Sequence, residues 1–126
     1  MKKMFVIVIA TVMSAVVSAQ DVISKENGMT VVNTTSIAKD VEGYNGPTPV
    51  KIYIKKNKVV KVEMLRSQDG PKYVAKVKNA ILSFWDGMTV KKALTVEPDA
   101  VTGATFTSNA VKANVKRGLE YYQKKK

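Results

Sequence analysis

The strongest constraint on the fold is a pair of alternating segments separated by a short turn. Residues 50–55 are Val-Lys-Ile-Tyr-Ile-Lys, and residues 60–65 are Val-Lys-Val-Glu-Met-Leu. Alternation with a period of two puts the even-numbered apolar residues of each segment on one face, which indicates two half-buried β-strands. Lys56 and Asn57 lie between them, and Asn tolerates the positive φ of a tight turn. The pattern predicts an antiparallel hairpin with Val60, Val62 and Met64 on its buried face.

The segments before the hairpin predict less structure. Residues 20–28 are polar, and we expect them to be poorly ordered. Residues 29–38 are rich in Val and Thr, which predicts a strand. Residues 43–47 (Gly-Tyr-Asn-Gly-Pro) are dense in turn formers.

Helical periodicity follows the hairpin. Pro71 after Asp69-Gly70 is typical of a helix start, and Gly87 suits a helix end. The predicted apolar stripe of this helix has spacings of three and four and consists of Val74, Val77, Ile81 and Phe84. Residues 89–94 predict a short turn of helix.

A second stripe predicts a last helix over residues 108–123, with Thr107 or Ser108 as its N-cap. That stripe consists of Val111, Val115, Leu119 and Tyr122. Together the elements predict a small α+β single domain in which an antiparallel sheet with a hairpin packs against helices.

The chain has no Cys and no His. The thiol nucleophile, the Ser-His-Asp triad and the commonest metal ligand are therefore excluded. If the protein performs difficult chemistry, we expect a cofactor to supply it.

Residues 1–19 have the layout of a secretory signal peptide. Lys2 and Lys3 precede an apolar run over residues 4–17, and Val17-Ser18-Ala19 fits a cleavage site before Gln20. We expect a cleaved signal and an exported protein, periplasmic or at the cell surface. The alternative is an uncleaved membrane anchor, although the run is shorter than the roughly 20 residues of a spanning helix.

The formal net charge is +11, from 21 Lys plus Arg against 10 Asp plus Glu. The lysines are scattered, with one run at residues 124–126, and no nucleic-acid-binding motif is present. Two interpretations stay open. The basic surface attracts acidic partners or anionic membranes, or it is a solvated face that keeps the protein soluble.

Residues 99–108 (Asp-Ala-Val-Thr-Gly-Ala-Thr-Phe-Thr-Ser) form a loop of small and hydroxyl-bearing residues that opens the last helix. Gly103 and Ala104 allow a ligand to approach the backbone closely. The helix supplies free N–H groups and the positive end of its dipole, which suits a phosphate. Ordinary N-capping explains the same composition, so the residue types alone leave both readings open.

The segment 99–105 resembles the flavinylation motif of the FMN-binding domain family. That family includes the covalent-flavin subunits of the sodium-pumping quinone reductase and of the related ferredoxin-linked membrane complex. Residues 43–47 with the hairpin, residues 85–89 (Trp-Asp-Gly-Met-Thr) and Ala93-Leu94 also resemble it, so the similarity covers about residues 41–122. On this basis residues 20–40 are an N-terminal segment with the first strand, and residues 41–126 are the FMN-binding domain.

The resemblance implies that Thr105 carries FMN through a phosphoester bond. An exported flavin transferase would make the bond, with FAD as donor and a divalent metal. Asp99, Gly103, Ala104 and Thr105 match the positions that the transferase recognises. Thr102 stands where many members have Ser. The predicted cofactor-binding set is Thr105 (covalent FMN), Thr102, Gly103, Ala104, Thr107 and Ser108.

The expected function is an exported electron carrier whose partners are the transferase and membrane-bound or exported redox proteins. A non-redox binding or scaffold domain and a small exported reductase that acts directly on a substrate are the alternatives. Tyr44, Met64 and Trp85 are candidates for contact with the flavin ring by residue type alone, and core packing is the commoner use of such residues.

Overall fold

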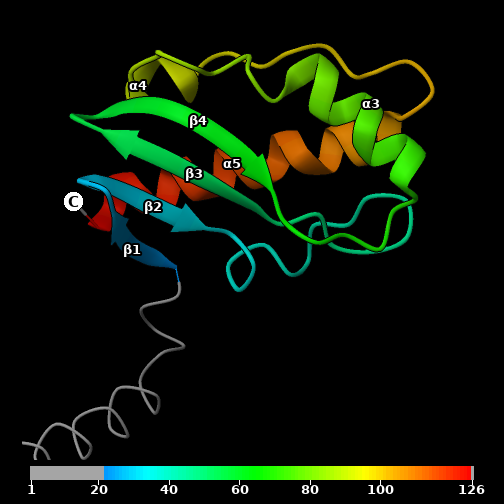
Figure 1. The fold of residues 1–126 in the computed structure, drawn as a ribbon, viewed down its shortest axis with the longest axis horizontal. Helices are drawn as coiled ribbons and strands as arrows, with labels where there is room; N and C mark the ends of the chain where they lie inside the picture. The colour runs from blue at the N-terminus through cyan, green and yellow to red at the C-terminus, as the bar shows by residue number, and fades with distance from the viewer. Residues whose placement is uncertain (1–21, 126) are drawn as a thin grey trace, which may run out of the picture.

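The structure is a computed structural model that describes residues 22–125 (Figure 1). The predicted signal over residues 1–19 and the predicted mature start at Gln20 lie outside this range. In the described part of the chain, no helix combines the length and the apolar character needed to span a membrane.

An antiparallel sheet forms one layer, as predicted, and it has four strands. Its strands are β1 (Ile23–Glu26), β2 (Met29–Asn33), β3 (Val50–Lys55) and β4 (Lys58–Met64), and they lie side by side in chain order. The hairpin of β3 and β4 turns at Lys56 and Asn57, whose φ angles are 52° and 62°. Two consecutive positive φ values give a turn whose twist matches that of the flanking strands.

The predicted burial of Val60 is wrong. A bulge shifts the register of the hairpin, so that Tyr53 pairs with Lys61 but Ile54 pairs with Val59. Val60 has no partner in β3 and is 40% exposed, while Val59 is 1% exposed. One extra residue in β4 changes the face that each residue before it occupies.

The predictions for the N-terminal segment need two corrections. Part of residues 20–28 forms β1, which pairs with β2 through a turn at Asn27 and Gly28. The predicted strand over residues 29–38 ends at Asn33, because its side-chain Oδ1 accepts the N–H of Thr35 at 2.9 Å and turns the chain.

Helix α3 (Pro71–Ile81) begins at Pro71, as predicted, with Gly70 as its N-cap. It ends at Ile81, so Phe84 and Gly87 lie in the turn that follows it rather than on the helix. The aromatic side chain that enters the core there is Trp85, which is 1% exposed.

Helix α4 (Val90–Ala93) is the predicted short turn, and the hydroxyl of Thr89 caps it by accepting the N–H of Lys92 at 3.1 Å. Helix α5 (Thr105–Lys125) begins three residues earlier than predicted and crosses one face of the sheet (Figure 1). Val111, Val115 and Leu119 of its predicted stripe are buried, and Tyr122 is half-buried.

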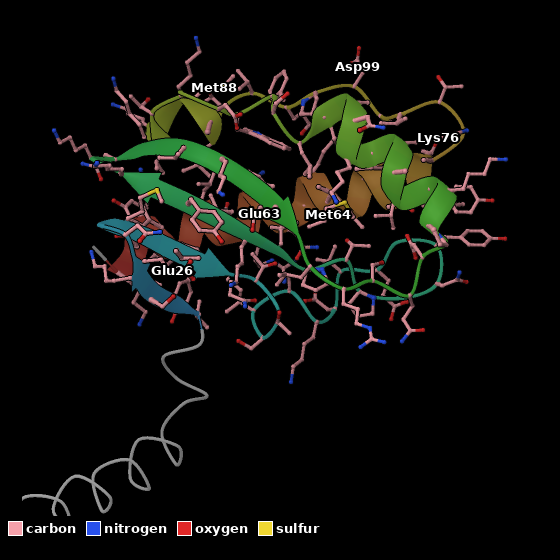
Figure 2. The ribbon with its side chains drawn as sticks, viewed as in Figure 1. Glu26, Glu63, Met64, Lys76, Met88 and Asp99 are labelled. Atoms are coloured by element: carbon pink, nitrogen blue, oxygen red, sulfur yellow. The ribbon has the colours of Figure 1, made fainter. Side chains whose placement is uncertain are left out.

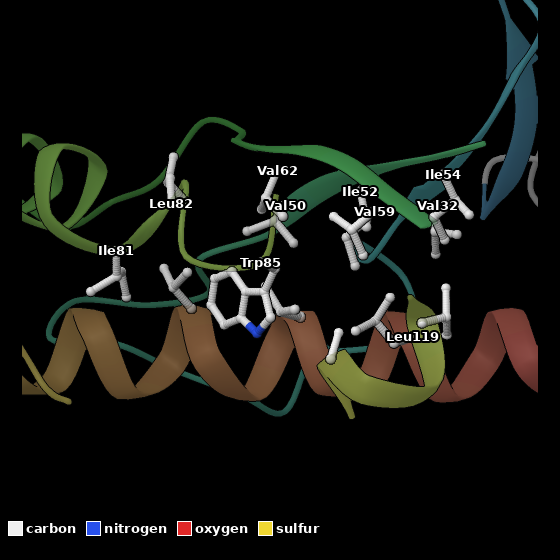
Figure 3. Close-up of a cluster of buried hydrophobic side chains, with 14 of the residues drawn as sticks. Val32, Val50, Ile52, Ile54, Val59, Val62, Ile81, Leu82, Trp85 and Leu119 are labelled. Atoms are coloured by element: carbon white, nitrogen blue, oxygen red, sulfur yellow. The ribbon is translucent and has the colours of Figure 1, made fainter. Parts of the chain in front are cut away.

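The core lies between the sheet, α5 and the loop that carries Trp85 (Figure 3). Gly118 brings α5 close to the sheet: a Cβ there would lie 2.7 Å from Cδ1 of Ile52. Asn114 is buried on the same helix, and its Oδ1 accepts the hydroxyl of Thr34 at 2.6 Å. This packing fixes α5 on the sheet and therefore fixes the position of its first turn.

Candidate functional site

The first turn of α5 has no side-chain cap. The residue before the helix is Ala104, which has no side-chain oxygen, and Thr105 is the exposed first residue. Within residues 22–125, no acceptor meets the backbone N–H groups of Thr105, Phe106 and Thr107, while the N–H of Ser108 donates to the carbonyl of Ala104. Three free donors and the positive end of a 21-residue helix suit an anion at this point.

The prediction that Thr107 or Ser108 caps this helix is wrong, because both lie inside it. The hydroxyl of Thr107 donates to the carboxylate of Asp69. The hydroxyl oxygen of Ser108 accepts the N–H of Val101 at 3.1 Å and donates to the carbonyl of Thr105 at 3.1 Å. Thr107 and Ser108 are 1% and 0% exposed, so their hydroxyls are engaged and inaccessible.

The loop before α5 leaves the remaining predicted residues at the surface. Asp99, Thr102 and Gly103 are exposed, and Ala104 is 4% exposed. Gly103 has φ of +83°, a conformation that favours glycine. A Cβ on Gly103 would lie 2.9 Å from Nζ of Lys76, so this ammonium group of α3 lies against the loop. Lys76 and Asp99 are labelled in Figure 2.

A pocket of about 230 Å³ lies next to Thr105. Its lining consists of Tyr44, Tyr73 and residues 103–107. The ring centroids of Tyr44 and Tyr73 are 5.8 Å apart, and those of Tyr44 and Phe106 are 6.1 Å apart. Tyr44 is 61% exposed and Phe106 is 63% exposed, so large apolar faces line an open pocket.

Asp69 holds the two walls of this pocket together. It is 4% exposed, and its carboxylate accepts the N–H of Tyr44 at 3.0 Å and that of Asn45 at 2.6 Å, in addition to the hydroxyl of Thr107. One buried carboxylate therefore joins the turn that carries Tyr44 to the first turn of α5.

Of the three residues proposed for ring contact by type, only Tyr44 lines the pocket. Trp85 is in the core, and Met64 packs against the core at the end of β4 (Figures 2 and 3). Four further residues lie at the site without having been predicted there: Asp69, Tyr73, Lys76 and Phe106.

A signal for two of these residues was present in the sequence. Phe106 directly follows Thr105, and Asp69 precedes Gly-Pro at a helix start, where an acidic residue is usually explained as a local cap. Tyr73 and Lys76 on α3 carry no local signal, because only the packing of α3 beside the loop brings them to the pocket. Among residues 22–125, no three acidic side chains lie close enough to hold a metal ion.

A family model matches most of the domain described above. The model of a family described as "FMN-binding domain" matches residues 43–120, more than half of the chain. The matched range includes the turn of Tyr44, Asp69, α3, the loop before α5 and most of α5. No curated protein matches the chain.

Proposed function

The chain belongs to the FMN-binding domain family, whose cofactor is FMN, and from that premise we propose that Thr105 carries FMN covalently in an exported electron carrier. FMN supplies the transfer of one or two electrons when it is bound, and the protein supplies the attachment, the orientation and the surroundings of the flavin.

The residues at the start of α5 fit a flavin phosphate. Thr105 offers an exposed hydroxyl, and the free N–H groups of residues 105–107 lie in the same turn. Lys76 adds a cation against Gly103, and among residues 22–125 it forms no salt bridge. Backbone donors, a helix dipole and an ammonium group are the partners that phosphates find in proteins.

The observation that carries the proposal is the difference between Thr105 and its neighbours. Four hydroxyls lie within residues 102–108, and those of Thr107 and Ser108 are buried and hydrogen-bonded. Thr102 is exposed but lies before Gly103, outside the last position of the motif. Thr105 is exposed, it is the first residue of α5, and it occupies the last position of the motif.

The attachment reaction balances with FAD as donor. The Oγ1 of Thr105 attacks the phosphorus that is bonded to the riboflavin part, and a new O–P bond forms. The P–O–P bond of FAD breaks, AMP leaves with the bridging oxygen, and the hydroxyl proton is lost to a base of the transferase or to water. No oxidation or reduction of the chain is required.

Tyr44 and Phe106 are the residues that we propose for contact with the flavin ring. Their large faces line the pocket beside Thr105 and are more than half exposed. Aromatic faces pack well against a flat conjugated ring. A ring held there would stay open to a partner protein on one side, which suits an electron carrier.

The test is intact mass spectrometry after coexpression with an exported flavin transferase. We expect an FMN-sized gain in the wild type and in Thr105→Ser, which keeps a hydroxyl, and no gain in Thr105→Val. The matched control is Thr95→Val, the same change at an exposed threonine outside the motif, which should keep the full gain.

A gain that persists in Thr105→Val would overturn the attachment site. A wild type that gains no FMN in the presence of an active transferase would favour the scaffold function. Two assays of the flavinylated protein separate a carrier from a reductase. A carrier is reduced by membrane donors, whereas a reductase turns over small acceptors. N-terminal sequencing of protein from the extracytoplasmic fraction tests export, with Gln20 as the expected first residue.

A further inference from the structure

Seven lysines gather at the end of the molecule opposite Thr105. They come from three segments that are distant in the sequence: the hairpin tip, α4 and the last turn of α5 (Figure 1). We name this surface the basic end, and its lysines are Lys55, Lys56, Lys58, Lys91, Lys92, Lys124 and Lys125.

Asn57 joins the three segments. Its carbonyl accepts the N–H of Val90, the first residue of α4, at 2.9 Å. Its side-chain Oδ1 accepts the hydroxyl of Tyr122, near the end of α5, at 2.6 Å. Nitrogen-tipped side chains project from this end in Figure 2. The lysines therefore form one surface, although they are scattered along the chain.

The lysines of the basic end outnumber the carboxylates near it. Glu26 lies beside the neighbouring β1–β2 turn and forms a salt bridge with Lys51, and Asp86 precedes Gly87, whose N–H donates to the carbonyl of Val59 beside the hairpin tip. All seven lysines are exposed, and within residues 22–125 none forms a salt bridge. Residues 55–58, 90–93 and 119–125 contain one carboxylate, that of Glu120. Like charges repel one another, so a cluster with this excess of positive charge favours an anionic partner.

The distance from Thr105 argues against a redox partner at this surface. Thr105 and Lys125 are the two ends of α5, and a rise of 1.5 Å per residue separates them by about 30 Å. Electron transfer becomes much slower as the distance between donor and acceptor grows. A protein docked on the basic end would therefore lie too far from Thr105 to exchange electrons efficiently with a flavin there.

The residue types favour a lipid surface over an acidic protein. The basic end contains seven lysines and no arginine. Protein interfaces are enriched in Arg and depleted in Lys, because the planar guanidinium forms directed, bidentate bonds. Lysine clusters of four to eight residues act as diffuse positive charge, which suits anionic headgroups. Tyr121 and Tyr122 lie half-buried beside them, and tyrosine is common at membrane interfaces.

We propose that the basic end binds anionic phospholipid surfaces and holds the first turn of α5 about 30 Å from the membrane. The pocket beside Thr105 then faces away from the lipid and stays accessible to soluble partners. Lipid binding itself does not require that Thr105 carry a flavin, so it can be tested separately from the proposed function.

The experiment measures sedimentation of the full chain with vesicles of phosphatidylglycerol mixed with phosphatidylcholine and with vesicles of phosphatidylcholine alone. The readout is the ratio of the two partition coefficients, because a retained apolar N-terminal segment would add binding to both vesicles. We expect a ratio well above one that falls as salt rises.

Two triple variants with equal net charge locate the binding surface. Lys55→Gln, Lys91→Gln and Lys124→Gln change one lysine in each segment of the basic end, and Lys39→Gln, Lys72→Gln and Lys78→Gln are the matched exposed control. Each lysine near an anionic surface contributes about fivefold, so the first triple should lower the ratio by about 100-fold. The control should change it severalfold at most.

Three results would overturn the proposal. One is no preference of the wild type for anionic vesicles, and another is an equal loss in both triple variants. The third is binding to polyglutamate without binding to anionic vesicles, which would assign the basic end to an acidic polypeptide.

Discussion

Replacing Asp69 with asparagine tests whether one carboxylate holds the two walls of the pocket together. The Oδ2 of Asp69 accepts the N–H of Tyr44 and the hydroxyl of Thr107, and its Oδ1 accepts the N–H of Asn45. Asparagine keeps one oxygen and presents an NH₂ group to the remaining donor. The variant therefore loses one charge-assisted bond and weakens the other two.

The expected loss in the free energy of unfolding is about 2–4 kcal/mol, because a hydrogen bond to a charged group contributes about 1.5–3 kcal/mol. A domain of this size has about 5–15 kcal/mol of stability, so Asp69→Asn should still fold. Urea unfolding gives the loss. Amide hydrogen exchange gives its location: the amides of Tyr44 and Asn45 should exchange faster than in the wild type.

A double-mutant cycle of Asp69→Asn with Thr107→Val measures the energy of the contact between Asp69 and Thr107 separately from any general loss of stability. Thr107 loses its buried hydroxyl in that variant, and the coupling energy with Asp69→Asn should lie within about 1–3 kcal/mol. Asp86→Asn is the control. Asp86 is exposed, and desolvation of its carboxyl by the surrounding chain raises the pKa, so removal of its charge should be neutral or slightly stabilising, within about 0.5 kcal/mol.

Two results would refute this account of the pocket. The first is additivity of Asp69→Asn and Thr107→Val within about 0.5 kcal/mol. The second is unchanged protection of the Tyr44 and Asn45 amides in a destabilised Asp69→Asn protein, which would place the damage away from the turn of Tyr44.

Three further predictions concern the rest of the domain. Gly118→Ala should lower the free energy of unfolding by about 1–3 kcal/mol in urea, since its Cβ would lie 2.7 Å from Cδ1 of the buried Ile52; an unchanged midpoint would contradict the close packing of α5 on β3. Gly103→Ala should cost about 1–2 kcal/mol in thermal unfolding, because its φ is +83°, and a stabilised variant would contradict this. The hydrogen bond from Arg117 lowers the pKa of the Asp40 carboxyl, so the stabilisation from this pair is present above the ordinary pKa and is lost as the pH falls through the lowered value. Asp40→Asn should reduce the acid-side slope of unfolding free energy against pH, and an identical slope would contradict the pairing.

The sequence by itself determined the local elements of this protein. Alternation and a turn with Asn predict the hairpin of β3 and β4, because a two-residue period and a positive φ are properties of neighbouring residues. Pro71 predicts the start of α3, because the preference of proline for the first helical position is also a local property of the chain. The segment 99–105 predicts the family, since the motif is continuous in the chain.

The tertiary structure decided which residues share the site. Asp69 is 25 residues from Tyr44 and 38 from Thr107, so no local pattern indicates their hydrogen bonds. Those contacts remove Thr107 from the capping role that its residue type predicts.

The same reason applies to burial and charge on the surface. The bulge that exposes Val60 depends on the register between two strands, and the basic end depends on Asn57 joining three distant segments. Backbone preferences act between residues that are close in the sequence. Packing and hydrogen bonding act between residues that are close in space, at any separation in the chain. Packing and hydrogen bonding therefore place Thr105 and the lysines at opposite ends of α5.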